Sequence, residues 1–90
     1  MSDAIESKIM VQGQTGKMRA AIANAARSLA VKGKIEELGD GSIEVTAQGR
    51  KEAVEALVKK LREMPGLDTV NVLQTIPQHQ AKQGFLSFRA

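Results

Sequence analysis

Cysteine, tryptophan and tyrosine are absent from this chain of 90 residues, and its only aromatic side chains are two phenylalanines. Without cysteine, the chain has no disulfide, no thiolate nucleophile and no cysteine-based metal site. The single histidine, His79, has no carboxylate close to it in the sequence, so the spacing of a metal-ligand cluster is missing. The sequence therefore predicts neither a metal nor another cofactor.

Long apolar runs are also missing. No segment approaches the roughly 18 apolar residues that span a bilayer, and no basic-then-apolar stretch opens the chain. We therefore expect a cytoplasmic protein with no membrane partner. The apolar content of 42% and the charged content of 26% are ordinary for a globular protein, and the length suits one domain over residues 1–90.

Acidic residues are unevenly distributed along the chain. None occurs between residues 7 and 35, although the net charge of the whole chain is only +3. The basic residues of that stretch are Lys8, Lys17, Arg19, Arg27, Lys32 and Lys34. They indicate either a solvated helix face or a patch that attracts phosphate-bearing ligands, and the sequence leaves both interpretations open.

The first half of the chain shows hydrophobic periodicity of two kinds. Ile5, Ile9 and Val11 alternate with polar residues, which predicts a strand that ends at Gly13. An alanine-rich apolar stripe at helical spacing predicts a helix over residues 17–31, with Thr15 as its N-cap. Strands are predicted over residues 34–38 and 43–48, joined by a glycine-rich turn.

The second half continues with one more helix and further strands. A one-sided apolar stripe predicts a helix over residues 51–63, and a proline–glycine pair ends it. A strand over residues 67–76, a polar loop over 77–84 and a short edge strand over 85–89 follow. The order β-α-β-β-α-β predicts an α+β fold of the ferredoxin-like type. In that sandwich, two helices cover one face of an antiparallel sheet and leave the other face to solvent.

The passage from the first strand into the first helix is the most informative part of the sequence. A strand that turns directly into a helix directs free backbone N–H groups and the positive end of the helix dipole at one spot, which favours a bound anion. The predicted phosphate-binding residues are Gly13, Gln14, Thr15, Gly16, Lys17, Met18 and Arg19.

Three segments in this order resemble the acylphosphatase family. They are Val-Gln-Gly at residues 11–13, Gly-Lys-Ile-Glu-Glu-Leu-Gly-Asp-Gly-Ser-Ile at 33–43, and Phe-Leu-Ser-Phe-Arg at 85–89. The resemblance implies that loop amides and an arginine hold the phosphoryl group of an acyl phosphate. It also implies that an asparagine on the second strand orients the attacking water, so catalysis is positioning and charge stabilisation.

The sequence departs from the family pattern at two places, and both concern the residues that would bind the phosphoryl group or orient the water. The turn before the helix is two residues longer, so the family's arginine corresponds to Arg19 when counted from Gly33 but to Lys17 when counted from Gly13. We favour Arg19, because a guanidinium can hold two phosphoryl oxygens. Glu37 replaces the asparagine, and as a carboxylate it opposes a dianion by about 1–4 kcal/mol at roughly 4 Å.

These departures leave three functional hypotheses. The favoured one is a binding or interaction module of this fold with little or no hydrolase activity. Its ligand would be a phosphate-bearing small molecule or an inorganic anion, and a protein partner is also possible in this hypothesis. In this hypothesis Glu37 pairs with Lys17 or Arg19 and fills the anion cradle. The alternative is an active acylphosphatase, with Arg19 as phosphate clamp and Glu37 in the catalytic site.

Non-specific nucleic-acid binding is the third hypothesis and the least favoured. Nucleic-acid-binding domains with the same order of elements stack bases on aromatic side chains of the central strands. The third predicted strand, residues 43–48, has no aromatic side chain.

Overall fold

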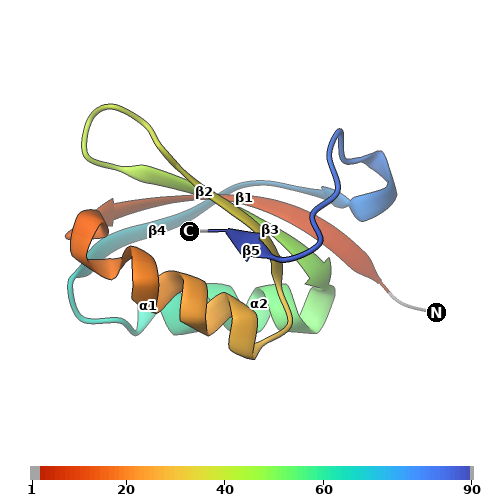
Figure 1. Cartoon of the computed structure of the whole chain (residues 1–90), viewed down its shortest axis with the longest axis horizontal. Coiled ribbons are helices and arrows are strands. Elements are labelled where there is room, and N and C mark those ends of the chain that lie inside the picture. The colour runs from red at the N-terminus through yellow and green to blue at the C-terminus, as the bar shows by residue number, and fades with distance from the viewer. Residues whose placement is uncertain (1–2, 90) are drawn as a thin grey trace.

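The computed structural model describes residues 3–89 and shows two helices beneath a curved sheet (Figure 1). The elements in chain order are β1 (Ala4–Gly13), α1 (Thr15–Ser28), β2 (Lys32–Glu37), β3 (Ile43–Arg50), α2 (Lys51–Arg62), β4 (Leu67–Pro77), the 3₁₀ turn η1 (Gln78–Gln80) and β5 (Phe88–Arg89). The predicted β-α-β-β-α-β order and its short final strand are confirmed.

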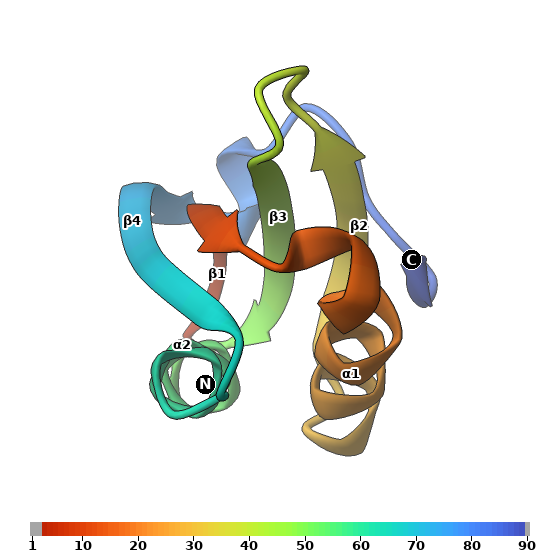
Figure 2. The ribbon, with the colours of Figure 1, turned by 90° about the vertical axis from the view of Figure 1, so that its left-hand side faces the viewer.

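The strands form one sheet in the order β4-β1-β3-β2-β5. β1 lies antiparallel to both β3 and β4, and β2 lies antiparallel to β3. β5 pairs with β2 in parallel through Gly33 and Phe88, so the sheet is mixed rather than wholly antiparallel. Figure 2 shows both helices side by side on the same face of the sheet, as the ferredoxin-like plan requires.

The hydrophobic core lies between this face and the helices. Alternate residues of β1, including Ile9 and Val11, point inward and are fully buried. From α2, Val54, Leu57 and Leu61 meet them, and these side chains are also inaccessible to solvent. α1 contributes Ile22 and three buried alanines, Ala23, Ala25 and Ala26. The stripes seen in the sequence are therefore the core-facing sides of the two helices.

α1 begins and ends earlier than predicted. It starts at Thr15 because the N–H groups of Lys17 and Met18 both donate to the Gln14 carbonyl at 3.1 Å, which closes the first turn. It ends at Ser28 because Ala30 adopts a left-handed conformation, with φ of 59°, while Val31 N–H donates to the Ala26 carbonyl. This is a Schellman motif. It usually contains a glycine, and because this one has alanine instead, the sequence predicted the end of the helix too late.

The other boundaries differ from the predictions by one to three residues. β2 begins at Lys32 rather than 34, β3 continues to Arg50 rather than 48, and β4 includes Pro77. α2 ends at Arg62, one residue before its predicted end. β5 begins only at Phe88, because the residues before it cross from the far face of the sheet to its edge.

The sheet face away from the helices is only partly open to solvent, in contrast to the prediction. η1 and the residues after it lie over this face (Figure 1), and they bury Glu6 and Gln48. Gln48 binds this segment directly: its Oε1 accepts the N–H of Phe85 at 3.2 Å and its Nε2 donates to the Gln83 carbonyl at 2.5 Å. A polar segment can cover a sheet because a buried amide satisfies its backbone groups.

Across residues 3–89, the helices are too short and too polar for any of them to cross a membrane.

Candidate functional site

Residues 13–19, here called the corner, connect β1 to α1 and include every residue predicted to bind phosphate. Gly13 has φ of 130°, and a Cβ placed on it would lie 2.5 Å from the Gly66 carbonyl oxygen. Gln14 N–H donates to that same oxygen at 2.8 Å. Only glycine allows β1 to end so close to the turn before β4, and this contact sets where the helix begins.

The corner directs few free N–H groups outward. Gln14 N–H is bonded to Gly66, and those of Lys17 and Met18 are bonded to the Gln14 carbonyl. For the N–H groups of Thr15 and Gly16, the part of the chain that the structure describes provides no acceptor. The turn before the helix consists of Gln14 alone, because α1 begins at Thr15. What remains is a helix start with two available donors and an exposed Lys17.

Thr15 does not cap α1, in contrast to the prediction. The N-cap is Gln14, and its side chain makes no capping hydrogen bond to α1. The Thr15 side chain is buried, and its hydroxyl donates to the Gly41 carbonyl at 2.8 Å. This bond holds the β2–β3 turn, which belongs to one of the segments that carry the family resemblance, against the first turn of α1.

Arg19 and Glu37 lie together at the edge of the corner. Arg19 Nη1 is 3.3 Å from Glu37 Oε1, which joins α1 to the last residue of β2. The side chain of Glu37 is 73% exposed and that of Arg19 is 29% exposed. An ion pair so open to water contributes only about 0.2–1 kcal/mol, so another anion can displace the carboxylate from Arg19.

The candidate site residues thus differ in the contacts that they make. Arg19 contacts Glu37, whereas Lys17 forms no ion pair with any residue in the range 3–89. Glu37 contacts the corner through Arg19, as the favoured hypothesis allows, while most of its side chain remains exposed. Met18 is half-buried against the core, so only its backbone belongs to the corner surface.

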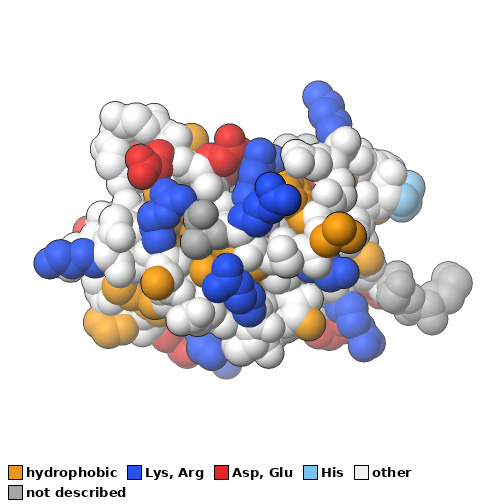
Figure 3. All heavy atoms as spheres, viewed as in Figure 1, with side chains coloured by type: hydrophobic (Ala, Val, Ile, Leu, Met, Phe, Trp, Pro, Cys, Tyr) orange, Lys and Arg blue, Asp and Glu red, His pale blue; other side chains and the backbone are white. Residues whose placement is uncertain are grey.

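The surface near α1 is favourable to anions. Lys and Arg side chains are spread over the face that contains α1 and β5, with fewer acidic side chains among them (Figure 3). Such a distribution raises the local concentration of anionic ligands. Sequence reasoning missed the carbonyl groups of Gly41 and Gly66 that shape the corner, because no side-chain pattern indicates a tertiary contact made by backbone.

The turn that Thr15 contacts is itself ordered by Asp40. The Asp40 carboxylate accepts bonds from the Ser42 hydroxyl and, at 2.9 Å, from the Ser42 N–H. The Ser42 hydroxyl is the main cause, and its N–H the second, of an Asp40 pKa below the ordinary value of 3.8. Because the folded pKa is lowered, this group stabilises the fold above pH 3.8, and the contribution is lost as pH falls through the folded pKa.

We therefore expect an NMR titration of side-chain carboxyl carbons to place the pKa of Asp40 below 3.8. Ser42→Ala removes the hydroxyl donor, so the pKa should rise toward 3.8 while the remaining backbone bond keeps part of the shift. Ser87→Ala, a change at an exposed serine in the segment before β5, serves as the control and should leave the titration unchanged. An unshifted Asp40 in the unaltered chain would contradict this account of the turn.

Known proteins resemble this chain in sequence and in fold. A model of the Acylphosphatase family matches residues 7–89. An acylphosphatase of Anaeromyxobacter sp. (strain Fw109-5) is 36% identical over 61 residues, a segment that makes up 66% of this chain and 66% of that protein. This match thus spans a little under two thirds of the relative's length.

Two solved structures show the same fold. The acylphosphatase from Coxiella burnetii superposes with a TM-score of 0.80 at 22% identity, over 97% of this chain and 92% of that one. Full-length HypF in its phosphate- and nucleotide-bound form superposes with a TM-score of 0.79 at 19% identity, over 99% of this chain but only 12% of HypF. Because the family model matches nearly all of the described residues, this chain belongs to the acylphosphatase family.

Proposed function

We propose that this chain binds phosphate-bearing small molecules or inorganic phosphate at the corner, and that its hydrolysis of acyl phosphates is suppressed. The observation that carries the proposal is the ion pair of 3.3 Å between Arg19 and Glu37. The guanidinium is the best phosphate ligand near the helix start, and a carboxylate holds it where the family resemblance leads us to expect a neutral amide.

Binding and hydrolysis place different demands on this pair. A phosphate needs only the two free N–H groups of Thr15 and Gly16, the helix dipole and the Arg19 side chain, and it displaces a weakly held carboxylate. For hydrolysis, the family resemblance also implies a side-chain amide that orients the attacking water. A carboxylate at position 37 has no N–H to offer in place of that amide, and a negative charge there opposes a dianion near Arg19.

The similarity to HypF supports a role in binding. There, a fold like this one forms about an eighth of a larger chain, so the fold is compatible with use as one module among others. The acylphosphatase names of the other relatives support the alternative, an active enzyme in which Arg19 clamps the substrate. The two differ in a measurable way, because only the enzyme turns over an acyl phosphate.

The test uses benzoyl phosphate as the substrate and inorganic phosphate as the ligand. We expect phosphate to shift the amide NMR signals of Thr15 and Gly16, and Arg19→Ala to weaken this binding about 10–100-fold, as loss of a charge-assisted bond does. Lys17→Ala should weaken binding less, and Lys60→Ala on the exposed side of α2 should not change it.

Two results would overturn the proposal. One is rapid hydrolysis of benzoyl phosphate by the unaltered chain that is lost in Arg19→Ala, which would establish the active enzyme. The other is a phosphate titration that leaves the signals of the corner unmoved.

A further inference from the structure

The sheet face away from the helices contains a polar hollow of about 580 Å³. Its floor is formed by the strands, and its roof is formed by residues 80–85, which follow β4 and cross this face (Figure 1). Neither the corner nor the Arg19–Glu37 pair belongs to it. A hollow of this volume is in the range that takes a small organic ligand, and it is larger than inorganic phosphate requires.

A row of four residues in register forms the floor. Lys8 is opposite Gln74 on one side and Thr46 on the other, and Thr46 is in turn opposite Lys34. All four line the hollow, because residues that are paired across strands project to the same face. Lys8 Nζ donates to Thr46 Oγ1 at 3.1 Å, so the ammonium group leans toward the centre of the row.

The roof is held in place by Gln48, which is completely buried. Besides its bonds to Phe85 and Gln83, its Nε2 donates to Glu6 Oε2 at 2.7 Å. The roof brings Lys82 and the Phe85 ring to the hollow. Because the buried Gln48 amide makes hydrogen bonds to the covering segment, that segment is held in a fixed position and the hollow is well defined.

The charges that line the hollow favour an anion. Lys8, Lys34 and Lys82 are opposed by one carboxylate, Glu6, which is bonded to Gln48. Two further acids lie nearby, outside the lining: Glu44 is 3.8 Å from Lys8 Nζ and Glu36 is 3.0 Å from Lys34 Nζ. Both pairs are partly exposed, and such pairs exchange readily for a better anion.

We propose that this hollow binds a phosphate monoester that carries a planar ring, of the size of a nucleoside monophosphate. The dianionic phosphate meets the ammonium groups above Thr46, and the ring lies against Phe85 and Ile76, which supply the apolar surface of the hollow. The side-chain amides of Gln74, Gln80 and Gln83 provide donors and acceptors for the polar edge of the ring.

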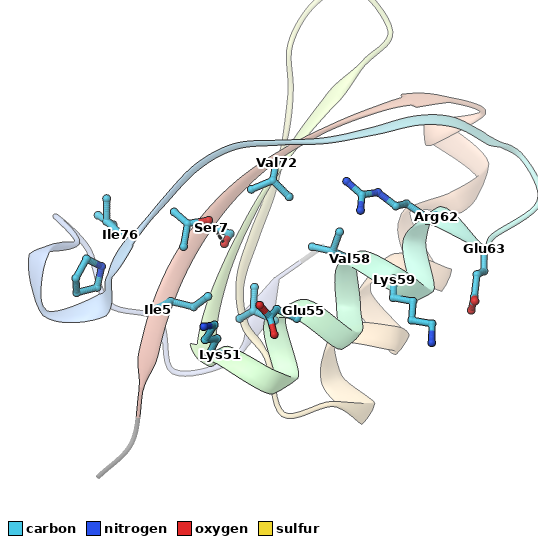
Figure 4. A pocket seen from close by; sticks show the side chains of 13 residues that line it. Ile5, Ser7, Lys51, Glu55, Val58, Lys59, Arg62, Glu63, Val72 and Ile76 are labelled. Atoms are coloured by element: carbon cyan, nitrogen blue, oxygen red, sulfur yellow. Dashed lines mark hydrogen bonds between the residues drawn. The ribbon is translucent and has the colours of Figure 1, made fainter.

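A larger cavity of different character provides a control. It is a groove of about 800 Å³ between α2 and β4, where Ile5, Val58 and Val72 face one another and charged side chains of α2 stand at the rim (Figure 4). Lys59 is one of these rim residues, and it is remote in sequence and in sheet face from the polar hollow.

The experiment titrates the full chain with AMP, adenosine and inorganic phosphate by NMR, in an Arg19→Ala background that weakens the corner. We expect AMP to shift the signals of Lys8, Thr46 and Phe85, and to bind at least tenfold more tightly than adenosine or phosphate alone. Lys8→Met and Lys82→Ala should each weaken AMP binding by about tenfold, as loss of one charge-assisted contact does, whereas Lys59→Met should not.

Lys82 is exposed in the segment after η1, so Lys82→Ala tests the site even if a change at Lys8 disturbs the sheet. AMP shifts confined to residues 13–19, equal affinity for AMP and phosphate, or an unchanged affinity in Lys82→Ala would each overturn the proposal. These outcomes are separate from the test of the corner, because the Arg19→Ala background leaves the hollow intact.

Discussion

Glu37→Asn is expected to raise the rate of benzoyl phosphate hydrolysis by about 10²-fold, the usual magnitude for one well-placed donor to the reacting atoms. Asparagine supplies an amide hydrogen bond for water and removes a negative charge from beside the phosphate. It also releases Arg19, whose Nη1 is held 3.3 Å from the carboxylate. The measurement is the initial rate at saturating substrate, compared with the spontaneous rate in the same buffer.

The control for this variant is the neighbouring residue. Glu36→Asn makes the same chemical change one position earlier on β2, but Glu36 lies on the opposite face of the sheet and pairs with Lys34. It should leave the rate unchanged. The double variant Arg19→Ala/Glu37→Asn should lose the gain, because the clamp is then missing. A gain that survives in the double variant would show that Arg19 has no role in the reaction.

Gly33→Ala is expected to destabilise the fold by about 3 kcal/mol or more. The residue is buried in β2 with φ of 145°, and a Cβ placed on it would lie 1.7 Å from the Thr46 carbonyl oxygen. A non-glycine residue in such a conformation costs about 1–3 kcal/mol, and the overpacked contact adds about 1–3 kcal/mol. The loss is a large part of the roughly 5–14 kcal/mol that a domain of this length has in total.

Urea denaturation measures this loss as a change in the midpoint with an unchanged slope. Gly16→Ala is the matched control, since the added Cβ would meet nothing within 4 Å and the residue lies in the first turn of α1. That variant should be neutral or more stable by about 0.5–1 kcal/mol. Equal stabilities of the two variants would contradict the close approach of β2 to β3 at Gly33.

The sequence predicted best those elements whose ends are marked by nearby residues. α2 departs from its prediction by one residue, because its apolar stripe and the proline–glycine pair after it are both local signals. The end of α1 was predicted three residues too late, since the left-handed residue there is Ala30 and carries no sequence mark. Its start was predicted two residues late, because the contact of Gln14 with Gly66 comes from a distant part of the chain.

Length, charge, hydrophobic period and three short segments were sufficient, by themselves, to determine the fold class and the family of this chain. These are properties of neighbouring residues, so they can be recognised in the sequence alone. The order of the residues also indicates which side chains lie at the corner. Only the tertiary structure decided which cation meets Glu37, how many N–H groups stay free, and that a buried glutamine holds a roof over the far face of the sheet. These features depend on contacts between residues far apart in the chain, and such contacts leave no periodic trace in the sequence.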